Sequence, residues 1–218
     1  MVVIQGTPRG TNRALTLTES EARVLRYILK KGPCHGYMIF KETGLTDKTT
    51  YISIKKLVGE GILSLTPGGD EPHPGRERKI YELSLFGFLI GLKLENDLEG
   101  ENLDRVVKIW SCIWPLVLGN WDYFKRIGQL DNARDHLKEI IISDYMWLHK
   151  SYNFDLITNE ITAHFYMAFW NSEQIPEELI MILNEDEIKT FMIDYLENEI
   201  SGDEDHIEYL NSILDCIE

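Results

Sequence analysis

One stretch of the chain, residues 17–90, limits the possible folds more than any other. It contains three segments whose apolar residues recur at helical spacing, followed by two short segments in which apolar and polar residues alternate. A Gly- and Pro-rich run, GGDEPHPGRER, separates the two alternating segments. The predicted order of elements is therefore helix, helix, helix, strand, loop, strand.

Local capping signals predict where these helices begin and end. Thr18 and Glu21 have the spacing of a capping box at the start of the first helix. Gly32, which is followed by a proline, ends that helix, and Gly44 closes the shorter second helix. Thr46 is a suitable N-cap for the third helix.

The third predicted helix, residues 47–60, has two different faces. The stripe that we expect to pack into the core consists of Thr50 (through its methyl group), Ile54, Leu57 and Val58. The opposite face consists of Lys48, Thr49, Ile52, Ser53, Lys55 and Lys56. A further basic group follows the predicted hairpin loop and consists of Arg76, Arg78 and Lys79.

This element order is that of a winged helix-turn-helix, in which the third helix enters the major groove and the hairpin loop rests on the neighbouring backbone. Phosphate contact requires basic residues at both places. We therefore expect the outer face of the third helix to contact the major groove. We expect the DNA backbone to be contacted by Arg76, Arg78 and Lys79. Ile52 is unusual on such a face: it could contact a thymine methyl group or pack against a protein partner.

The total formal charge of the chain, −14, has the wrong sign for a nucleic-acid binder, but the charge is unevenly distributed. Residues 1–92 contain 13 Lys or Arg and 9 Asp or Glu, a net of +4. The remaining residues contain 9 basic and 27 acidic side chains, a net of −18. Such asymmetry indicates a nucleic-acid surface on the basic side. An acidic surface can also simply keep a helical domain soluble.

Three motifs stand in order within residues 17–90: GPCHGYMIF, TYISIKKLVGEGIL and GRERKIYELSLFG. Together they resemble the PadR-type transcription regulators, within the wider winged-helix group that includes MarR-like proteins. The matching positions are Gly32, Pro33, His35, Gly36, Tyr37, Lys55, Lys56, Leu57, Glu60, Gly61, Ile62, Arg78, Lys79, Tyr81, Leu83, Ser84 and Gly87. The resemblance covers under half of the chain. It implies a winged helix that binds operator DNA.

The rest of the chain is predicted to be helical throughout. A helix in SLFGFLIGLKLENDL leaves the predicted wing. The further candidate helices are residues 103–118 (bent near Pro115), 121–127, 132–150, 156–171, 177–184, 187–200 and 204–217. We therefore expect a mostly α protein with a small β-hairpin wing. Its predicted parts are an N-terminal arm at residues 1–16, a winged helix-turn-helix at 17–90 and an acidic all-helical dimerisation or effector domain at 91–218.

All the tryptophans of the chain lie in this helical half: Trp110, Trp114, Trp121, Trp147 and Trp170. Trp110 and Trp114 are four residues apart and are expected to share a helix face. The run HFYMAFW adds more aromatic side chains. Such residues form cores and dimer seams, and they also line effector pockets. Both interpretations stay open at this point.

Motifs for catalysis or metal binding are not found in the sequence. It contains no G-x-S-x-G, no phosphate-cradling glycine loop and no histidine pair at i, i+4. The three cysteines, Cys34, Cys112 and Cys216, form no C-x-x-C pair, so neither a disulfide framework nor a zinc site is indicated. We expect no cofactor and a reducing, cytoplasmic setting. No signal peptide is visible, and the most apolar stretch, residues 109–119, is too short to span a bilayer.

The sequence thus predicts a cytoplasmic, sequence-specific DNA-binding transcription regulator rather than an enzyme. We expect it to act as a homodimer, with its third helix in the major groove and its wing on the backbone. Its expected partners are double-stranded DNA, a second copy bound through the helical half, and a small-molecule effector, but no membrane. The alternative is a winged-helix module that binds a protein partner and does not contact DNA.

Overall fold

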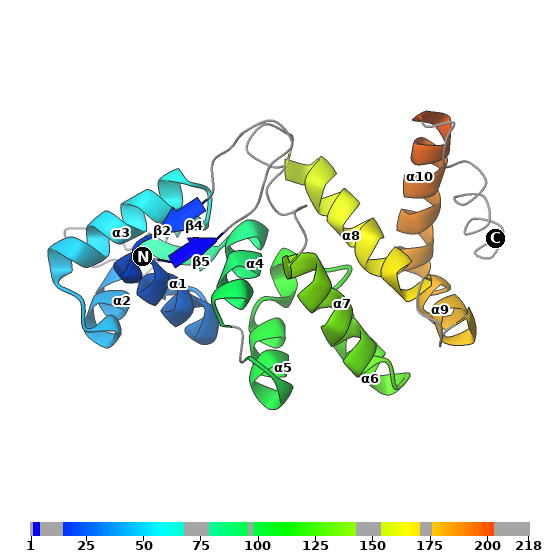
Figure 1. Ribbon diagram of the computed structural model, residues 1–218, viewed down its shortest axis with the longest axis horizontal. Helices are drawn as coiled ribbons and strands as arrows, with labels where there is room; N and C mark the ends of the chain where they lie inside the picture. The colour runs from blue at the N-terminus through cyan, green and yellow to red at the C-terminus, as the bar shows by residue number, and fades with distance from the viewer. Residues whose placement is uncertain are drawn as a thin grey trace. The chain divides into compact units, whose positions relative to one another are not determined.

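The computed structural model describes residues 2–4, 15–67, 79–95, 98–142, 154–170 and 176–202 of the chain (Figure 1). Within these ranges the protein is mostly helical and contains a small three-stranded antiparallel sheet. The chain divides into an N-terminal unit, Met1–Leu118 with Ile141–Leu148, and a C-terminal unit, Gly119–Ile140 with His149–Glu218. The predicted fold class is confirmed at this level.

The N-terminal unit begins its helical part with α1 (Glu19–Lys31), α2 (Gly36–Thr43) and α3 (Asp47–Gly59), which lie against one another (Figure 1). The predicted caps are confirmed. The Glu21 backbone N–H donates to Thr18 Oγ1 over 3.3 Å, and the Thr18 N–H donates to Glu21 Oε2 over 2.8 Å. Gly32 and Gly44, with φ of 89° and 68°, end α1 and α2 in a backbone conformation that glycine adopts without strain.

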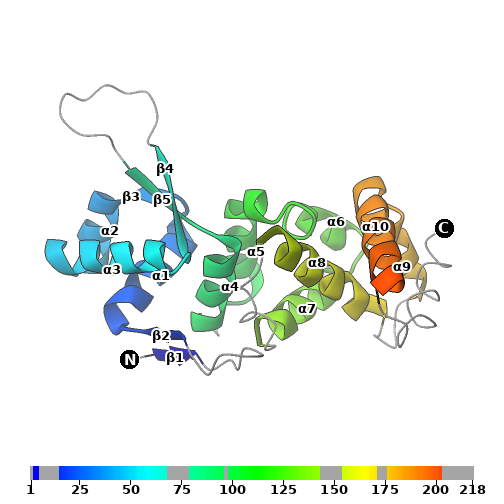
Figure 2. The same ribbon diagram turned by 90° about the horizontal axis from the view of Figure 1, so that it is seen from above.

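The larger sheet of this unit has the strand order β3-β5-β4, from β3 (Cys34–His35), β4 (Leu63–Pro67) and β5 (Lys79–Leu83). β4 and β5 are the two predicted strands, and they pair antiparallel with Leu65 opposite Tyr81 (Figure 2). β3 was not predicted, because its two residues are too few to show an alternating pattern.

The next helix, α4 (Leu85–Leu94), packs on the backbone that follows α3. A Cβ atom at Gly87 would lie 1.9 Å from the carbonyl oxygen of Ile62, so this crossing requires glycine. Ser84 fixes the helix start: its hydroxyl donates to Gly61 O over 2.7 Å and accepts from the Gly87 N–H over 3.0 Å. The close packing of α4 on this backbone therefore explains the glycine of the GRERKIYELSLFG motif.

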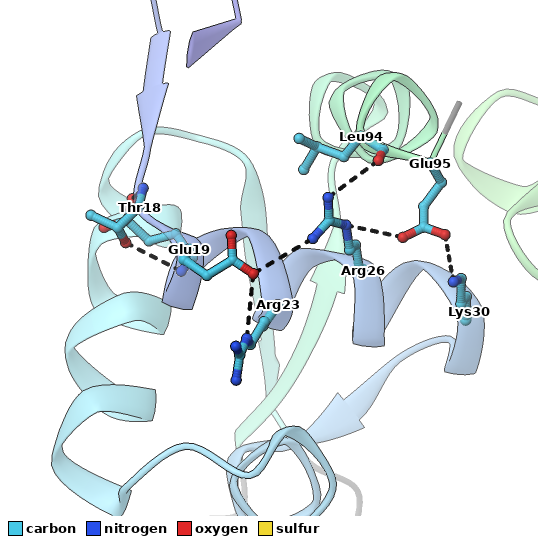
Figure 3. Close-up of polar contacts among 8 residues, drawn as sticks. Thr18, Glu19, Arg23, Arg26, Lys30, Leu94 and Glu95 are labelled. Atoms are coloured by element: carbon cyan, nitrogen blue, oxygen red, sulfur yellow. Dashed lines mark hydrogen bonds and ion pairs between the residues drawn. The ribbon is translucent and has the colours of Figure 1, made fainter. Parts of the chain in front are cut away.

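Ion pairs join the C-terminal end of α4 to α1 (Figure 3). Arg26 Nε lies 3.0 Å from Glu95 Oε1, and Lys30 Nζ lies 2.5 Å from the other oxygen of the same carboxylate. Arg26 also donates to the backbone oxygen of Leu94 over 3.4 Å. Both cationic groups lie at the carbonyl end of α4, where the helix dipole is negative.

The N-terminal unit extends further than predicted, through α5 (Gly100–Ile109) and the 3-10 turn η1 (Ser111–Ile113). The buried indole Nε1 of Trp110 donates to the Leu29 carbonyl over 2.8 Å. In a continuing helix that carbonyl would bond to the residue four positions later, which is Pro33 and has no N–H. The N-terminal unit thus runs to Leu118, beyond residue 90, where the winged helix-turn-helix was predicted to end.

The predicted helix 103–118 is wrong in its second half. α5 ends at Ile109, and Trp110 and Trp114 lie in the turns that follow, so they do not share a helix face. Both indoles are nevertheless buried.

The N-terminal arm predicted at 1–16 also differs, because β1 (Val2–Ile4) pairs antiparallel with β2 (Leu15–Leu17). Strands of three residues are too short to predict from alternation.

The C-terminal unit contains α6 (Trp121–Arg126), α7 (Leu130–Ile142), α8 (Phe154–Trp170), α9 (Pro176–Leu183) and α10 (Asp186–Gly202). Each begins within two residues of its predicted start, whereas the predicted helix 204–217 lies outside the described residues. Among the described helices, none is both long and apolar enough to cross a membrane.

Aromatic rings form the core of this unit. Phe124 stacks on Phe169 with ring centres 5.7 Å apart, and Phe165 meets Phe124 edge-on at 5.8 Å. The ring of His136 lies edge-on to Phe169 at 4.4 Å. Phe165 and Phe169 belong to the HFYMAFW run, so for these residues the core interpretation is supported. Trp147 lies outside the described residues.

Candidate nucleic-acid interface

The inner face of α3 fixes this helix to the rest of the N-terminal unit. Thr50, Ile54 and Leu57 are buried, as predicted. At the start of the helix Thr46 accepts a hydrogen bond from the Thr49 backbone N–H over 3.2 Å, and the two hydroxyl oxygens lie 2.8 Å apart. Thr49 is half-buried and takes part in this cap, so its side chain is less available to DNA than predicted.

The outer face of α3 presents two lysines with an apolar residue between them. Lys48 and Lys55 are exposed, and among the described residues neither forms an ion pair. Ile52 lies between them and is 58% exposed. Positions 48, 52 and 55 follow the i, i+4, i+7 spacing of one helix face. The lysine spacing predicted from the sequence is therefore present on an accessible surface.

Ser53 does not belong to this surface, although it was predicted to do so. It is only 3% exposed. The residue turns inward because it precedes Leu57 by four positions and therefore lies above it on the buried face. The sequence misled because a serine is polar, yet its side chain is small enough to be accommodated in a packed interface.

Lys56 has a partner within the protein. Its Nζ lies 3.0 Å from Glu21 Oε2, and the Glu21 carboxylate is buried, 4% of the residue remaining exposed. The same oxygen accepts the Thr18 N–H of the capping box. Lys56 therefore attaches α3 to the first turn of α1, and its charge is partly balanced there. Glu21 was predicted only as a capping residue; nothing in its local pattern indicates a partner 35 residues away.

Only some of the residues predicted to contact the DNA backbone lie within the described ranges. Lys79 is exposed at the first position of β5, opposite Pro67, whereas Arg76 and Arg78 lie outside the described residues. The Lys79 carbonyl lies 3.3 Å from His35 Nδ1, on the neighbouring strand β3. The base of the hairpin thus carries one basic side chain in a defined position.

Further side chains on this part of the molecule were missed. The exposed apolar side chains of this unit include Tyr37, Met38, Tyr51 and Leu65, in addition to the predicted Ile52. A Cβ atom at Gly36 would lie 3.4 Å from the ring of Tyr51 and 3.3 Å from that of Tyr81, so this glycine lets both rings approach α2. Tyr51 could have been found from its position between Thr50 and Ile52, at the margin of the two helix faces.

The described residues contain no cluster of three or more His, Cys, Asp or Glu side chains suited to a metal ion. Burial raises the pKa of Cys34 to about 11, so this thiol is protonated at neutral pH. Neither the protein-family models nor the curated proteins and solved structures compared with this chain gave a match. The resemblance to PadR-type regulators thus rests on the quoted motifs alone.

Proposed function

We propose that this protein is a sequence-specific DNA-binding transcription regulator in which α1, α2, α3 and the β4–β5 hairpin act as a winged helix-turn-helix. α3 would lie in the major groove and the hairpin on the adjacent backbone. The observation that carries the proposal is the outer face of α3, where Lys48 and Lys55 are exposed without ion pairs among the described residues. Lysines in this state can bind phosphates without first breaking a bond within the protein.

The remaining features of the N-terminal unit support this assignment. The buried face of α3 and the Glu21–Lys56 pair hold the helix in a fixed position, as a recognition element requires. Lys79 adds a positive charge at the hairpin. Residues 1–92 have a net charge of +4, so electrostatic repulsion from the acidic remainder would favour approach of DNA to this side.

The direct test is binding of the full chain to short duplexes of random sequence, measured by fluorescence anisotropy. The variant Lys48→Gln/Lys55→Gln should bind at least tenfold more weakly than the wild type. The matched control, Lys31→Gln/Lys108→Gln, removes the same charge from exposed positions on α1 and α5 and should bind within about twofold of wild type. Equal losses in both variants would mean that only net charge matters.

We further propose that the protein is a cytoplasmic homodimer associated through its helical C-terminal half. Two-fold symmetry then predicts half-sites about one DNA turn, or about 34 Å, apart. The free thiols of Cys34 and Cys112 are consistent with a reducing compartment. Light scattering tests the stoichiometry, and a monomeric mass at working concentration would contradict the dimer.

A small-molecule effector stays a prediction, to be tested by ligand-induced changes in tryptophan fluorescence.

The second candidate is a protein-interaction module, which the exposed apolar side chains of the N-terminal unit favour. Tyr37, Met38, Tyr51, Ile52 and Leu65 offer the aromatic and aliphatic anchors that protein interfaces use. This function predicts that no duplex is retarded in a gel. It also predicts a co-purifying protein that the variant Ile52→Asp releases.

A further inference from the structure

We propose that Ile52 contacts the 5-methyl group of a thymine, so that the DNA site of this protein contains a T·A base pair opposite the middle of α3. This inference rests on the proposed function, because it requires α3 to lie in a major groove. It goes further by assigning the type of base that one side chain recognises.

The placement of Ile52 makes it the central side chain of the outer face. It follows Lys48 by four residues and precedes Lys55 by three, so the three lie along one line on the helix. Four residues beyond Lys55 the line reaches Gly59, which has no side chain and has open space where a Cβ atom would be. Ile52 is therefore the apolar member of this line, and it is 58% exposed.

Tyr51 is also exposed, but its ring occupies a different place. It lies beside Gly36 at the start of α2 and near the ring of Tyr81 on β5. Its direction is thus set by contacts within the protein, whereas the side chains of the outer line, Lys48, Ile52 and Lys55, are exposed to solvent. A base opposite the middle of α3 would meet Ile52 first.

The chemistry of the groove then selects the base. In the major groove thymine presents an apolar methyl group at C5 beside its O4 acceptor, whereas cytosine has only a hydrogen at C5 and the purines present hydrogen-bond donors or acceptors along this edge. An isoleucine placed against such a polar edge would remove its water without supplying a hydrogen bond, which is unfavourable. Thymine is therefore the base on which Ile52 can bury an apolar methyl group.

The flanking charges favour DNA over a protein as the occupant of this face. An apolar protein surface docked on Ile52 would also cover the amino groups of Lys48 and Lys55, and burying an unpaired charge is costly. Phosphates along the groove would instead attract both lysines. A duplex with a thymine opposite Ile52 therefore provides phosphates for the two lysines and an apolar contact for the isoleucine.

The test uses deoxyuridine, which differs from thymidine only by lacking the methyl group. Duplexes retained by the full chain are selected from a random pool, and each thymine of the tightest one is replaced in turn. At one thymine per half-site, uracil should lower the affinity of the wild type about fourfold, the equivalent of about 0.8 kcal/mol for one buried methyl group. Ile52→Ala should bind the thymine and uracil duplexes equally.

Lys48→Gln is the matched control, because it should weaken binding to both duplexes and leave their fourfold ratio unchanged. The inference is overturned if uracil is neutral at every thymine, or if Ile52→Ala keeps the wild-type ratio. Either result would leave the proposed DNA binding intact. If the full chain retains no duplex from the pool, the proposed function fails, and this inference fails with it.

Discussion

Glu21 Oε2 lies 3.0 Å from Lys56 Nζ, so the capping box of α1 and the last turn of α3 share one buried carboxylate. Two adjacent lysines on α3 consequently have different roles. Lys55 is exposed to solvent, whereas Lys56 positions the helix. A helix that presents side chains to a ligand needs such a fixed orientation, since small displacements weaken several contacts together.

The first prediction compares these two lysines. Lys56→Gln should lower the free energy of unfolding by about 1–2 kcal/mol, because it leaves a buried carboxylate without its cation. Lys55→Gln, on the same turn, should change it by less than about 0.5 kcal/mol. Urea denaturation measures both values. Equal stability of the two variants would show that the Glu21–Lys56 pair contributes nothing.

The second prediction concerns two glycines that the sequence alone does not distinguish. Gly87→Ala should lower the free energy of unfolding by more than about 3 kcal/mol or prevent folding, because its Cβ atom would overlap the Ile62 carbonyl. Gly59→Ala, in a helix with open space around the new atom, should raise it by about 0.5–1 kcal/mol. Thermal unfolding followed by circular dichroism distinguishes these outcomes. A tolerated alanine at Gly87 would contradict the described crossing of α4.

The third prediction concerns the indole of Trp110. Trp110→Phe keeps a large aromatic side chain but removes the N–H that bonds to the Leu29 carbonyl. The free energy of unfolding should fall by about 1–3 kcal/mol, the range for a buried polar group left without a partner, with some further loss from the smaller ring. Denaturation in urea provides the value. An unchanged unfolding midpoint would indicate that this bond does not hold α5 to α1.

The fourth prediction concerns the pH dependence of the C-terminal unit. His136 is 8% exposed, and neither ring nitrogen has a hydrogen-bond partner among the described residues. Burial lowers the pKa of His136, and the Glu139 carboxylate, 3.6 Å from Nδ1, opposes this only in part. The folded state therefore favours the neutral ring. The stability that the neutral ring contributes is fully present above about pH 6.5, the pKa of histidine in the unfolded chain. It is lost as the pH falls through the lower pKa of His136 in the folded protein.

The thermal midpoint of the wild type should accordingly fall between pH 7 and pH 5 by more than that of His136→Phe, which cannot be protonated. Differential scanning fluorimetry across this range gives both curves. Parallel curves would mean that protonation of His136 does not affect folding.

The sequence predicted those features that arise from local chemistry. Capping at Thr18 and Thr46 and helix ends at Gly32 and Gly44 each depend on residues a few positions apart, and the strands β4 and β5 each show their own alternating pattern; all are confirmed. The features it missed depend on contacts between distant segments. The Lys56–Glu21 pair and the Trp110–Leu29 bond span 35 and 81 residues, and neither leaves a periodic pattern.

The candidate surface shows the same limit. Helical periodicity correctly placed Lys48, Ile52 and Lys55 outside, but it did not place Ser53, whose polarity suggested exposure and whose position faces the core. The side of the helix, and not the polarity of the residue, decides burial at such a position. Arg76 and Arg78 remain predictions, since they lie outside the described residues.

The most direct test of the central claim is the salt dependence of DNA binding by the full chain. If a dimer neutralises about eight phosphates, the logarithm of the association constant should fall against the logarithm of salt with a slope near −7 between about 50 and 200 mM. Lys48→Gln/Lys55→Gln, which removes about four of these contacts per dimer, should bring the slope to about −3.5. A flat salt response of the wild type, or a slope that the double variant leaves unchanged, would contradict the claim that this face of α3 binds DNA.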